Sequence, residues 1–192
     1  MKVWEYENYE EYKKEQVAGN KMKLNSVWVK QESIQEILKL KPFAGEVICH
    51  GTRNGREQEL FKKFLPSCFV IGTEISDTAT KFPNTIEWDF HEVKEEFVNR
   101  FDILYSNSFD HSYDPEKCLR TWKDQINPLG IMALELMTGI ENVSRPMDPL
   151  EISVQEFEQL AMKIGLRVQA KFNMIRTKTA KNQNAIMIVL KK

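Results

Sequence analysis

The sequence predicts an α/β domain built around a mostly parallel β-sheet. From Glu46 onward, short apolar runs alternate with amphipathic helical stretches, as parallel strands and their crossover helices do. The chain has 192 residues, 42% of them hydrophobic, which is enough for one sizeable core. A turn with glycine at positions 51 and 55 joins the first apolar run to a helical stretch. These features predict one main domain with a ligand loop after its first strand.

Seven apolar runs are predicted to be strands, and four amphipathic stretches between them are predicted to be helices. The strands are expected at Glu46 to His50, Phe69 to Glu74, Thr85 to Asp89, Phe101 to Asn107, Ile131 to Leu136, Arg167 to Asn173 and Ala185 to Leu190. The helices are expected at Arg56 to Phe64, Val93 to Asn99, Pro115 to Gln125 and Val154 to Ile164. The last two strands are joined by the polar stretch Thr177 to Gln183, so we expect an antiparallel hairpin at one sheet edge.

Residues 1–40 precede the sheet and are predicted to form a helical N-terminal extension. Within Tyr6 to Asn20, the residues Tyr9, Tyr12 and Gln16 have helical spacing, and a second amphipathic stretch covers residues 32–40. The first helix, with Tyr12 and Gln16, is a candidate lid that closes over a ligand and excludes water. The alternative, an amphipathic helix that simply packs on the sheet, stays open.

Composition argues against several classes of protein. The 27 basic and 28 acidic residues leave a net charge of −1, which gives no bulk attraction to nucleic acid or to an anionic membrane. Cys49, Cys68 and Cys118 lack the spacing of a zinc site or a disulfide framework, so we expect reduced thiols and a cytoplasmic location. The first fifteen residues are rich in Glu, Tyr and Lys, and no apolar run approaches membrane-spanning length. Neither a signal peptide nor a membrane span is therefore expected.

The turn from His50 to Gly55, with the sequence His-Gly-Thr-Arg-Asn-Gly, is a candidate ligand loop. In open α/β sheets, ligands bind at the carboxyl ends of strands where the strand order reverses, and glycine lets the backbone approach them closely. A dinucleotide-binding turn carries GxGxxG around a pyrophosphate, whereas this turn has two glycines and Arg53 in the middle position. Strand-to-helix turns also contain glycine for purely conformational reasons, so the turn alone leaves both interpretations open.

Acidic residues end the next two predicted strands. Glu74 ends the second strand, where a carboxylate can accept hydrogen bonds from both hydroxyls of an adenosine ribose. Asp89 ends the third strand and is followed by Phe90, a pair that suits an adenine amine and the face of its ring. Acids at exposed strand ends also serve simply as solubilising groups, and for Asp89 that alternative stays open.

From about Phe43 to Lys192, the order of these features resembles the class I S-adenosylmethionine-dependent methyltransferases. That family has a glycine turn, an acid at the second strand end, an acid near the third, and a fourth-strand motif that leads to an Asp-Pro helix. Here that last stretch runs from Phe101 to Asp114-Pro115, and Asn127-Pro-Leu-Gly130 is close to the family's lysine-proline-glycine turn. The chain departs from the pattern at Cys49, where an acid usually precedes the first glycine, and at Arg53, which replaces the middle glycine.

The resemblance implies a three-layer, Rossmann-like fold for residues 41–192. It implies a seven-stranded sheet of order 3-2-1-4-5-7-6 with the last strand antiparallel. It also implies S-adenosylmethionine as the cofactor. The exit from the fifth strand, Met137 to Pro149, and the hairpin turn are both short and leave little material for a separate substrate domain, so we expect a small molecule as the methyl acceptor. The cofactor-binding residues that it implies are His50, Gly51, Thr52, Asn54, Gly55, Glu74, Ile75, Asp89, Phe90, Ser106 and Asn107.

His111, just beyond the fourth predicted strand, is the candidate general base. Imidazole titrates near neutral pH and can accept a proton from a hydroxyl or amine acceptor. Methyl transfer from a sulfonium is an in-line displacement in which positioning supplies much of the catalysis, so a base is not obligatory. The alternative, that His111 orients the cofactor or caps the helix at Pro115, stays open. No metal is predicted, because His50 and His91 lack partners at metal-ligand spacing.

Two other functions compete with methyl transfer. The departures at Cys49 and Arg53 favour a catalytically silent binding protein that has kept the fold, and fold alone does not exclude it. A nicotinamide-dependent dehydrogenase would share the acid at Glu74, but the missing GxGxxG and the terminal hairpin argue against it. As partners we expect a small-molecule acceptor, with the protein a monomer or homodimer, and neither nucleic acid nor a membrane.

Overall fold

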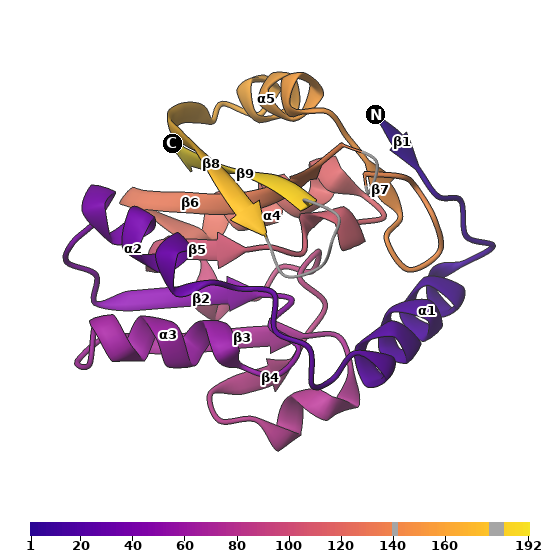
Figure 1. Ribbon diagram of the computed structural model, residues 1–192, viewed down its shortest axis with the longest axis horizontal. Helices are drawn as coiled ribbons and strands as arrows, with labels where there is room; N and C mark the ends of the chain where they lie inside the picture. Colours follow the sequence, from indigo (N-terminus) through magenta and orange to yellow (C-terminus); the bar gives the residue numbers. More distant parts are fainter. Residues whose placement is uncertain (140–141, 177–182) are drawn as a thin grey trace.

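A computed structural model describes residues 1–139, 142–176 and 183–192, and its centre is a seven-stranded β-sheet (Figure 1). The strands of this sheet are β2 (Glu46–His50), β3 (Phe69–Glu74), β4 (Thr85–Glu87), β5 (Phe101–Ser106), β6 (Ile126–Thr138), β8 (Arg167–Arg176) and β9 (Gln183–Lys191). Their spatial order is β4-β3-β2-β5-β6-β9-β8, which confirms the predicted order 3-2-1-4-5-7-6. All pairs from β4 to β6 are parallel, whereas β9 is antiparallel to both β6 and β8. The predicted terminal hairpin is therefore confirmed.

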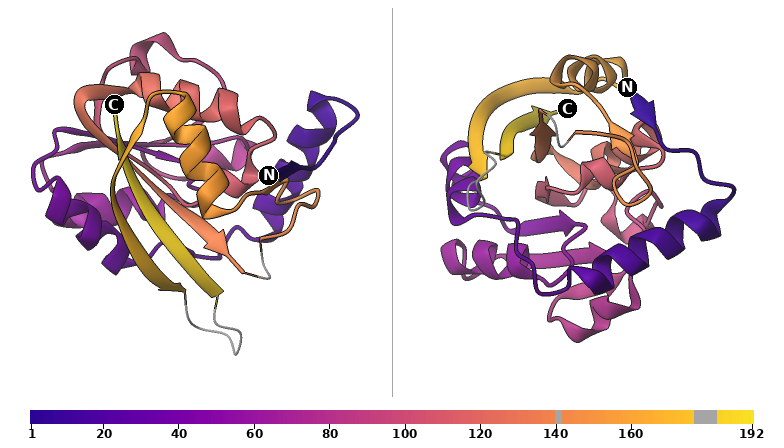
Figure 2. Two further views of the ribbon diagram at one scale, coloured as in Figure 1. Left: turned by 90° about the horizontal axis from the view of Figure 1, so that it is seen from above. Right: turned by 45° about the vertical axis from the view of Figure 1, so that its right-hand side comes forward.

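Helices cover both faces of the sheet (Figure 2). The α-helices are α1 (Tyr9–Met22), α2 (Gln31–Leu40), α3 (Arg56–Phe64), α4 (Pro115–Gln125) and α5 (Val154–Lys163), and all but α1 pack on these faces. On one face, α4 and α5 pack through a core that includes Trp122 and Phe157. On the other face, α2 and α3 pack through Ile37 and Phe61. Because both faces are covered, the central strands are apolar almost throughout, which is why they stand out in the sequence.

Two helices begin at N-capping residues that can be recognised in the sequence. Ser153 and Glu156 form a capping box at α5, in which each side chain bonds the other's backbone N–H. Asp114 caps α4 by accepting from the Lys117 N–H, and Pro115 occupies the first helical turn. These caps place both helices within a residue of their predicted bounds.

The first helix, α1, lies at the edge of the sheet where the parallel strands end (Figure 1). Asn8 caps α1 by accepting a hydrogen bond from the Glu11 N–H. Before it, β1 (Lys2–Val3) pairs antiparallel with β7 (Leu150–Glu151), a small second sheet that the sequence does not predict. This pairing, together with an ion pair between the N-terminal amine and Glu156, ties the start of the chain to the segment before α5.

The predicted helix over Val93 to Asn99 is wrong. The structure has only a 3-10 turn, η2 (Glu95–Phe97), at this place. Of the apolar side chains there, Phe97 is buried but Val93 is 60% and Val98 44% exposed, so no apolar face exists to hold a helix against the sheet. A second 3-10 segment, η1 (Asp77–Lys81), lies between β3 and β4.

Parts of two predicted connections lie outside the described residues. They are residues 140–141, within the exit from the fifth strand (Met137 to Pro149), and residues 177–182, within the predicted hairpin connection. In the described part of the chain, no helix is both long and apolar enough to cross a lipid bilayer.

The α5 core gives a stability prediction. Phe157→Ala should lower the free energy of unfolding by about 3 to 5 kcal/mol, because it leaves a cavity beside Phe109, whose ring centroid is 5.4 Å away. Urea denaturation measures this loss. Met162→Ala on the same helix is the control: Met162 is 61% exposed and its loss should stay within about 0.5 kcal/mol. Equal losses would contradict the assigned buried face of α5.

Candidate functional site

The glycine turn places backbone at the centre of the site. Gly51, Arg53 and Gly55 all have positive φ, of 68°, 45° and 74°, so the chain leaves β2 and enters α3 through three left-handed residues. The Gly51 N–H donates to the Thr73 carbonyl at 2.9 Å, which pins the turn to the end of β3. A Cβ on Gly51 would lie 2.6 Å from the Ser108 Cβ. Glycine is therefore required there for the close approach of the turn to the segment after β5.

Two adjoining hollows flank this turn. We call the first the α1 pocket, because α1 covers it; its lining includes Tyr12, Gln16, Asn20, Glu74, Ile75, Asp89 and Phe90. We call the second the outer pocket; its lining includes Trp28, Thr52, Asn54, Glu57, Asn107, Asp110, Arg145 and Asp148. Lys23, Gly51, Arg53, Ser108 and His111 line both. A ligand that spans both hollows therefore passes over the glycine turn.

Glu74 is the buried acid of the α1 pocket. Its Oε2 accepts from the Arg53 N–H at 3.0 Å and its Oε1 from the Ser76 N–H at 3.2 Å. Burial raises the pKa of Glu74 even though these two donors favour the carboxylate. Each oxygen retains a further acceptor position, so the carboxylate can still receive hydroxyl donors from a ligand.

Asp89 is more fully engaged than Glu74. Its Oδ1 accepts from the His91 backbone N–H at 2.9 Å and lies 2.7 Å from His91 Nδ1, while its Oδ2 accepts from the Tyr9 hydroxyl at 2.9 Å. Burial alone would raise the pKa of Asp89, but these donors together hold it below its usual value. His91 Nε2 lies 2.8 Å from Ser112 Oγ, and both side chains are fully buried. This Asp–His–Ser chain therefore fixes Asp89 and offers no nucleophile to a substrate.

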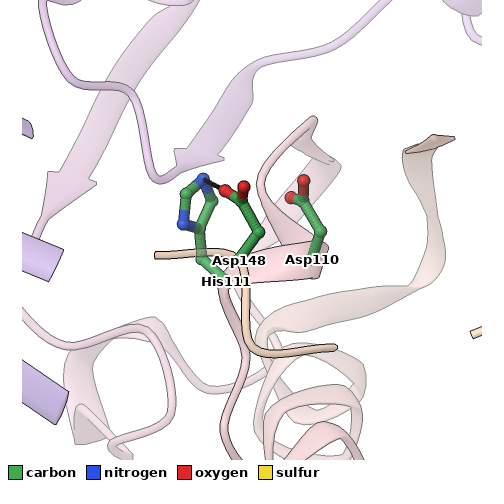
Figure 3. A group of neighbouring side chains, drawn as sticks. All are labelled: Asp110, His111 and Asp148. Atoms are coloured by element: carbon green, nitrogen blue, oxygen red, sulfur yellow. Dashed lines mark ion pairs between the residues drawn. The ribbon is translucent and has the colours of Figure 1, made fainter. Parts of the chain in front are cut away.

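His111 lies where the two pockets meet, and its ring is held from one side. Nδ1 is 2.8 Å from the Met147 carbonyl and 2.9 Å from Gln16 Oε1. Because both neighbours accept hydrogen bonds, Nδ1 carries the hydrogen in the neutral ring. Nε2 faces Asp148 Oδ1 at 3.8 Å (Figure 3). Nε2 is therefore the position at which His111 can accept a proton.

Asp110, His111 and Asp148 stand together at the outer pocket (Figure 3), with possible ligand atoms within 4.8 Å of one another. Their geometry is open to a divalent cation, but Asp148 already forms an ion pair with Arg145. A cation here would compete with Arg145 for Asp148 and would take the lone pair of His111 Nε2.

Most of the residues expected from the sequence line these pockets, but three do not. His50 Nδ1 lies 2.8 Å from Thr73 Oγ1 and Nε2 lies 2.7 Å from Gln125 Oε1, so the ring is in the core, and burial lowers its pKa to about 4. Ser106 is buried and donates to the His50 carbonyl. Gly55 caps α3 behind the turn.

Other pocket residues were not predicted. Glu57 lies in the first turn of α3, directly after the glycine turn, and lines the outer pocket. The sequence did carry this signal, because a charged residue there follows the predicted ligand loop. Met147, Asp148 and Arg145 come from the segment before β7. Only tertiary contacts bring that segment to the site, so no local pattern could have found it.

No known protein-family signature matches the sequence, and no curated protein matches it. Solved structures do match its fold. The Burkholderia thailandensis 1,6-didemethyltoxoflavin-N1-methyltransferase, solved with 1,6-didemethyltoxoflavin and S-adenosylhomocysteine, has a TM-score of 0.78 at 13% identity, over 98% of this chain and 92% of its own. A chain from Haloferax volcanii, from a complex with the Trm112 methyltransferase activator, has a TM-score of 0.68 at 13% identity, over 96% and 98%.

The chain thus has the Rossmann-like fold of the class I S-adenosylmethionine-dependent methyltransferases, as its sequence predicts. The same fold matches the [4+2]-cyclase SpnF, with a TM-score of 0.65 at 9% identity over 84% of this chain and 80% of that one. At such identities, fold does not decide chemistry, which has to be argued from the site.

The geometry of His111 gives a prediction about its tautomer. In the neutral ring, the hydrogen should sit on Nδ1, held by the Met147 carbonyl and Gln16. Long-range ¹H–¹⁵N correlation spectra at pH 8 report the state of each ring nitrogen. A neutral ring with its hydrogen on Nε2 would contradict the assigned geometry and would remove the proton acceptor from the pocket.

Proposed function

We propose that this chain is an S-adenosylmethionine-dependent methyltransferase that acts on a small-molecule acceptor. The observation that carries the proposal is the placement of Glu74, a buried acid at the end of β3 beside the glycine turn, inside a pocket that Ile75 and Phe90 also line. A carboxylate there suits the two hydroxyls of a ribose, and the two apolar side chains suit the faces of an adenine ring. The structural neighbour solved with S-adenosylhomocysteine supports this choice of ligand.

Unpartnered polar atoms in both pockets fit a polar ligand of this kind. Asn20 Nδ2 in the α1 pocket, and Arg53 Nε and Asn107 Nδ2 in the outer pocket, are buried without a hydrogen-bond partner. Unpaired buried donors are costly, and such groups in a cleft are typical of a site that a ligand completes. The residues present therefore fit a ligand with acceptors at both ends.

Bound S-adenosylmethionine would supply a methyl group on a sulfonium. The chain's own contribution is positioning, through the glycine turn, and a proton acceptor, through His111. His111 Nε2 would take the proton of an acceptor hydroxyl or amine in the outer pocket, while Met147 and Gln16 hold the ring. Asp148, whose Oδ1 is 3.8 Å from Nε2, would stabilise the imidazolium that forms.

The outer pocket supports a small, polar acceptor. Its lining combines Lys23 and Arg145 with Asp110 and Asp148, and Trp28 and Met137 add apolar surface. Polar groups on two sides and one aromatic wall suit a compact ring or chain that carries its own polar substituents.

We propose that α1 is a lid over the cofactor. The ring of Tyr12 packs against His91 and Tyr113. Other contacts are hydrogen bonds: the Tyr12 hydroxyl donates to the His111 carbonyl at 3.2 Å, and the Thr78 hydroxyl donates to Asn20 Oδ1 at 2.7 Å. Tyr9 holds Asp89 on the same face. Such hydrogen bonds can be exchanged for ligand contacts at little net cost, which suits an element that opens and closes.

The ribose contact gives a binding prediction. In calorimetric titration with S-adenosylhomocysteine, Glu74→Ala should weaken binding by roughly 1 to 3 kcal/mol, because the ribose hydroxyls lose their buried acceptor. Glu87→Ala is the matched control, since Glu87 ends the neighbouring strand β4 and is exposed; its affinity should not change. Wild-type protein that binds neither S-adenosylmethionine nor S-adenosylhomocysteine would contradict the proposed function and favour a silent scaffold.

The lid gives a second prediction. At a ligand concentration ten times Kd, S-adenosylhomocysteine should slow tryptic cleavage at Lys13 and Lys14 by about tenfold, because bound ligand holds α1 closed. Lys39 on α2, remote from both pockets, is the control and should be cut at an unchanged rate. Cleavage in α1 that ligand does not slow, although calorimetry shows binding, would mean that α1 is a fixed part of the fold.

A further inference from the structure

We propose that Glu57 and Arg53 form a charged clamp for the amino-acid end of the ligand, in which Glu57 pairs with an α-ammonium group and Arg53 with an α-carboxylate. The inference rests on the proposed function, since S-adenosylmethionine is the ligand whose adenosine would occupy the α1 pocket. It assigns the opposite end of that ligand to two residues of the outer pocket.

Glu57 is a buried acid whose charged form is favoured by its own backbone N–H and by Asn107. It is 6% exposed, it lines the outer pocket, and its Oε2 has no hydrogen-bond partner. It forms no ion pair within the described part of the chain, although Arg53 is near enough to favour its charged form. A buried carboxylate is costly when unpaired, so an acid at this place in a pocket wall suits a cationic group that arrives with the ligand.

Arg53 carries the complementary charge. Its backbone has a φ of 45°, and Arg53 lines both pockets. Its Nε is buried and unpartnered. Its guanidinium forms no ion pair with Glu57, Glu74, Asp110 or Asp148, the acids around it in the described part of the chain. A planar guanidinium with free donors is the group that best matches a carboxylate.

Asn107 completes the arrangement from the end of β5. Its Nδ2 is buried and unpartnered, and its side chain lies close enough to Glu57 to favour the carboxylate. Cys49, two residues before Gly51, supplies no competing charge, because burial raises its pKa well above the usual value. An anion for the ammonium group therefore comes from α3 and not from β2.

The pH dependence of binding follows from what surrounds Glu57. The groups that face it are Arg53 in the turn, Asn107 after β5, Glu135 on β6 and Cys49 on β2. Burial raises the pKa of Glu57 to about 7. Near pH 6 the free protein therefore holds a proton there, which an arriving ammonium group displaces. Affinity for an amine-bearing ligand should rise from pH 6 to pH 8.

Three ligands separate the two contacts. 5′-Methylthioadenosine lacks the amino-acid end, decarboxylated S-adenosylhomocysteine keeps only the amine, and S-adenosylhomocysteine has both groups. Calorimetry with each ligand is run on wild type, Glu57→Gln and Arg53→Gln. Glu59→Gln and Arg56→Gln are matched controls, since both residues are exposed on α3 and pair with each other. Binding of 5′-methylthioadenosine also reports that a variant is folded.

Glu57→Gln should weaken both amine-bearing ligands about 10- to 100-fold, the effect of losing a charge-assisted hydrogen bond, and should abolish the rise in affinity between pH 6 and pH 8. Arg53→Gln should weaken S-adenosylhomocysteine by a similar factor but leave the decarboxylated ligand unchanged. Neither variant should alter affinity for 5′-methylthioadenosine, and both controls should match wild type.

Unchanged affinity of Glu57→Gln for S-adenosylhomocysteine would overturn the clamp while the proposed function stands. The clamp would also be overturned if Lys23→Gln showed the loss predicted for Arg53→Gln while Arg53→Gln did not. Likewise, it would be overturned if Asp110→Asn showed the loss predicted for Glu57→Gln while Glu57→Gln did not. Wild-type protein that binds none of the three ligands would instead contradict the proposed function itself.

Discussion

Three left-handed residues within five positions turn the chain out of β2 and into α3, and the site depends on this turn. The backbone at Gly51 lies so close to Ser108 that a Cβ at position 51 would clash with the Ser108 side chain. Arg53 has a left-handed backbone conformation, which costs energy for any residue other than glycine. Arg53 also lines the outer pocket. Gly55 then starts α3 so that Glu57 falls in its first turn and faces the same space. The turn thus brings a guanidinium and an acid to the wall of the same pocket.

The sheet and the polar contacts around this turn play different parts. Two apolar cores fix the strand ends, and hence Glu74 and Asp89, with the rigidity of close packing. At the edge of the site, α1 contacts the pocket residues through hydrogen bonds of Tyr9, Tyr12 and Gln16 and through the buried ring of Tyr12. The proposed lid therefore differs from the sheet in that hydrogen bonds make up part of its contacts, and a hydrogen bond can be exchanged with water or ligand at little net cost.

Sequence reasoning succeeded where local pattern and burial agree. The central strands are covered on both faces, so they appear as apolar runs. Glu74 ends β3 as predicted, whereas Asp89 lies two residues beyond the end of β4, and both line the α1 pocket. His50 was predicted to bind the cofactor, but its ring lies in the core beside Gln125. The sequence next to a glycine turn does not indicate which way a polar side chain points. Met147 and Asp148 lie at the site through tertiary contacts with Gln16 and His111, which leave no periodic signal in the sequence. Glu57 could have been predicted, because the start of α3 at Gly55 places it in the first helical turn beside the glycine turn.

Likeness of fold extends to a cyclase as well as to methyltransferases, so the position of the ligand is the claim on which the account rests. A crystal structure of this chain with S-adenosylhomocysteine is the most direct measurement of it. We predict adenosine in the α1 pocket, with its ribose hydroxyls on Glu74 and its amino-acid end between Glu57 and Arg53. Adenosine bound anywhere else, or an empty α1 pocket in crystals grown at a saturating concentration of ligand, would contradict the account.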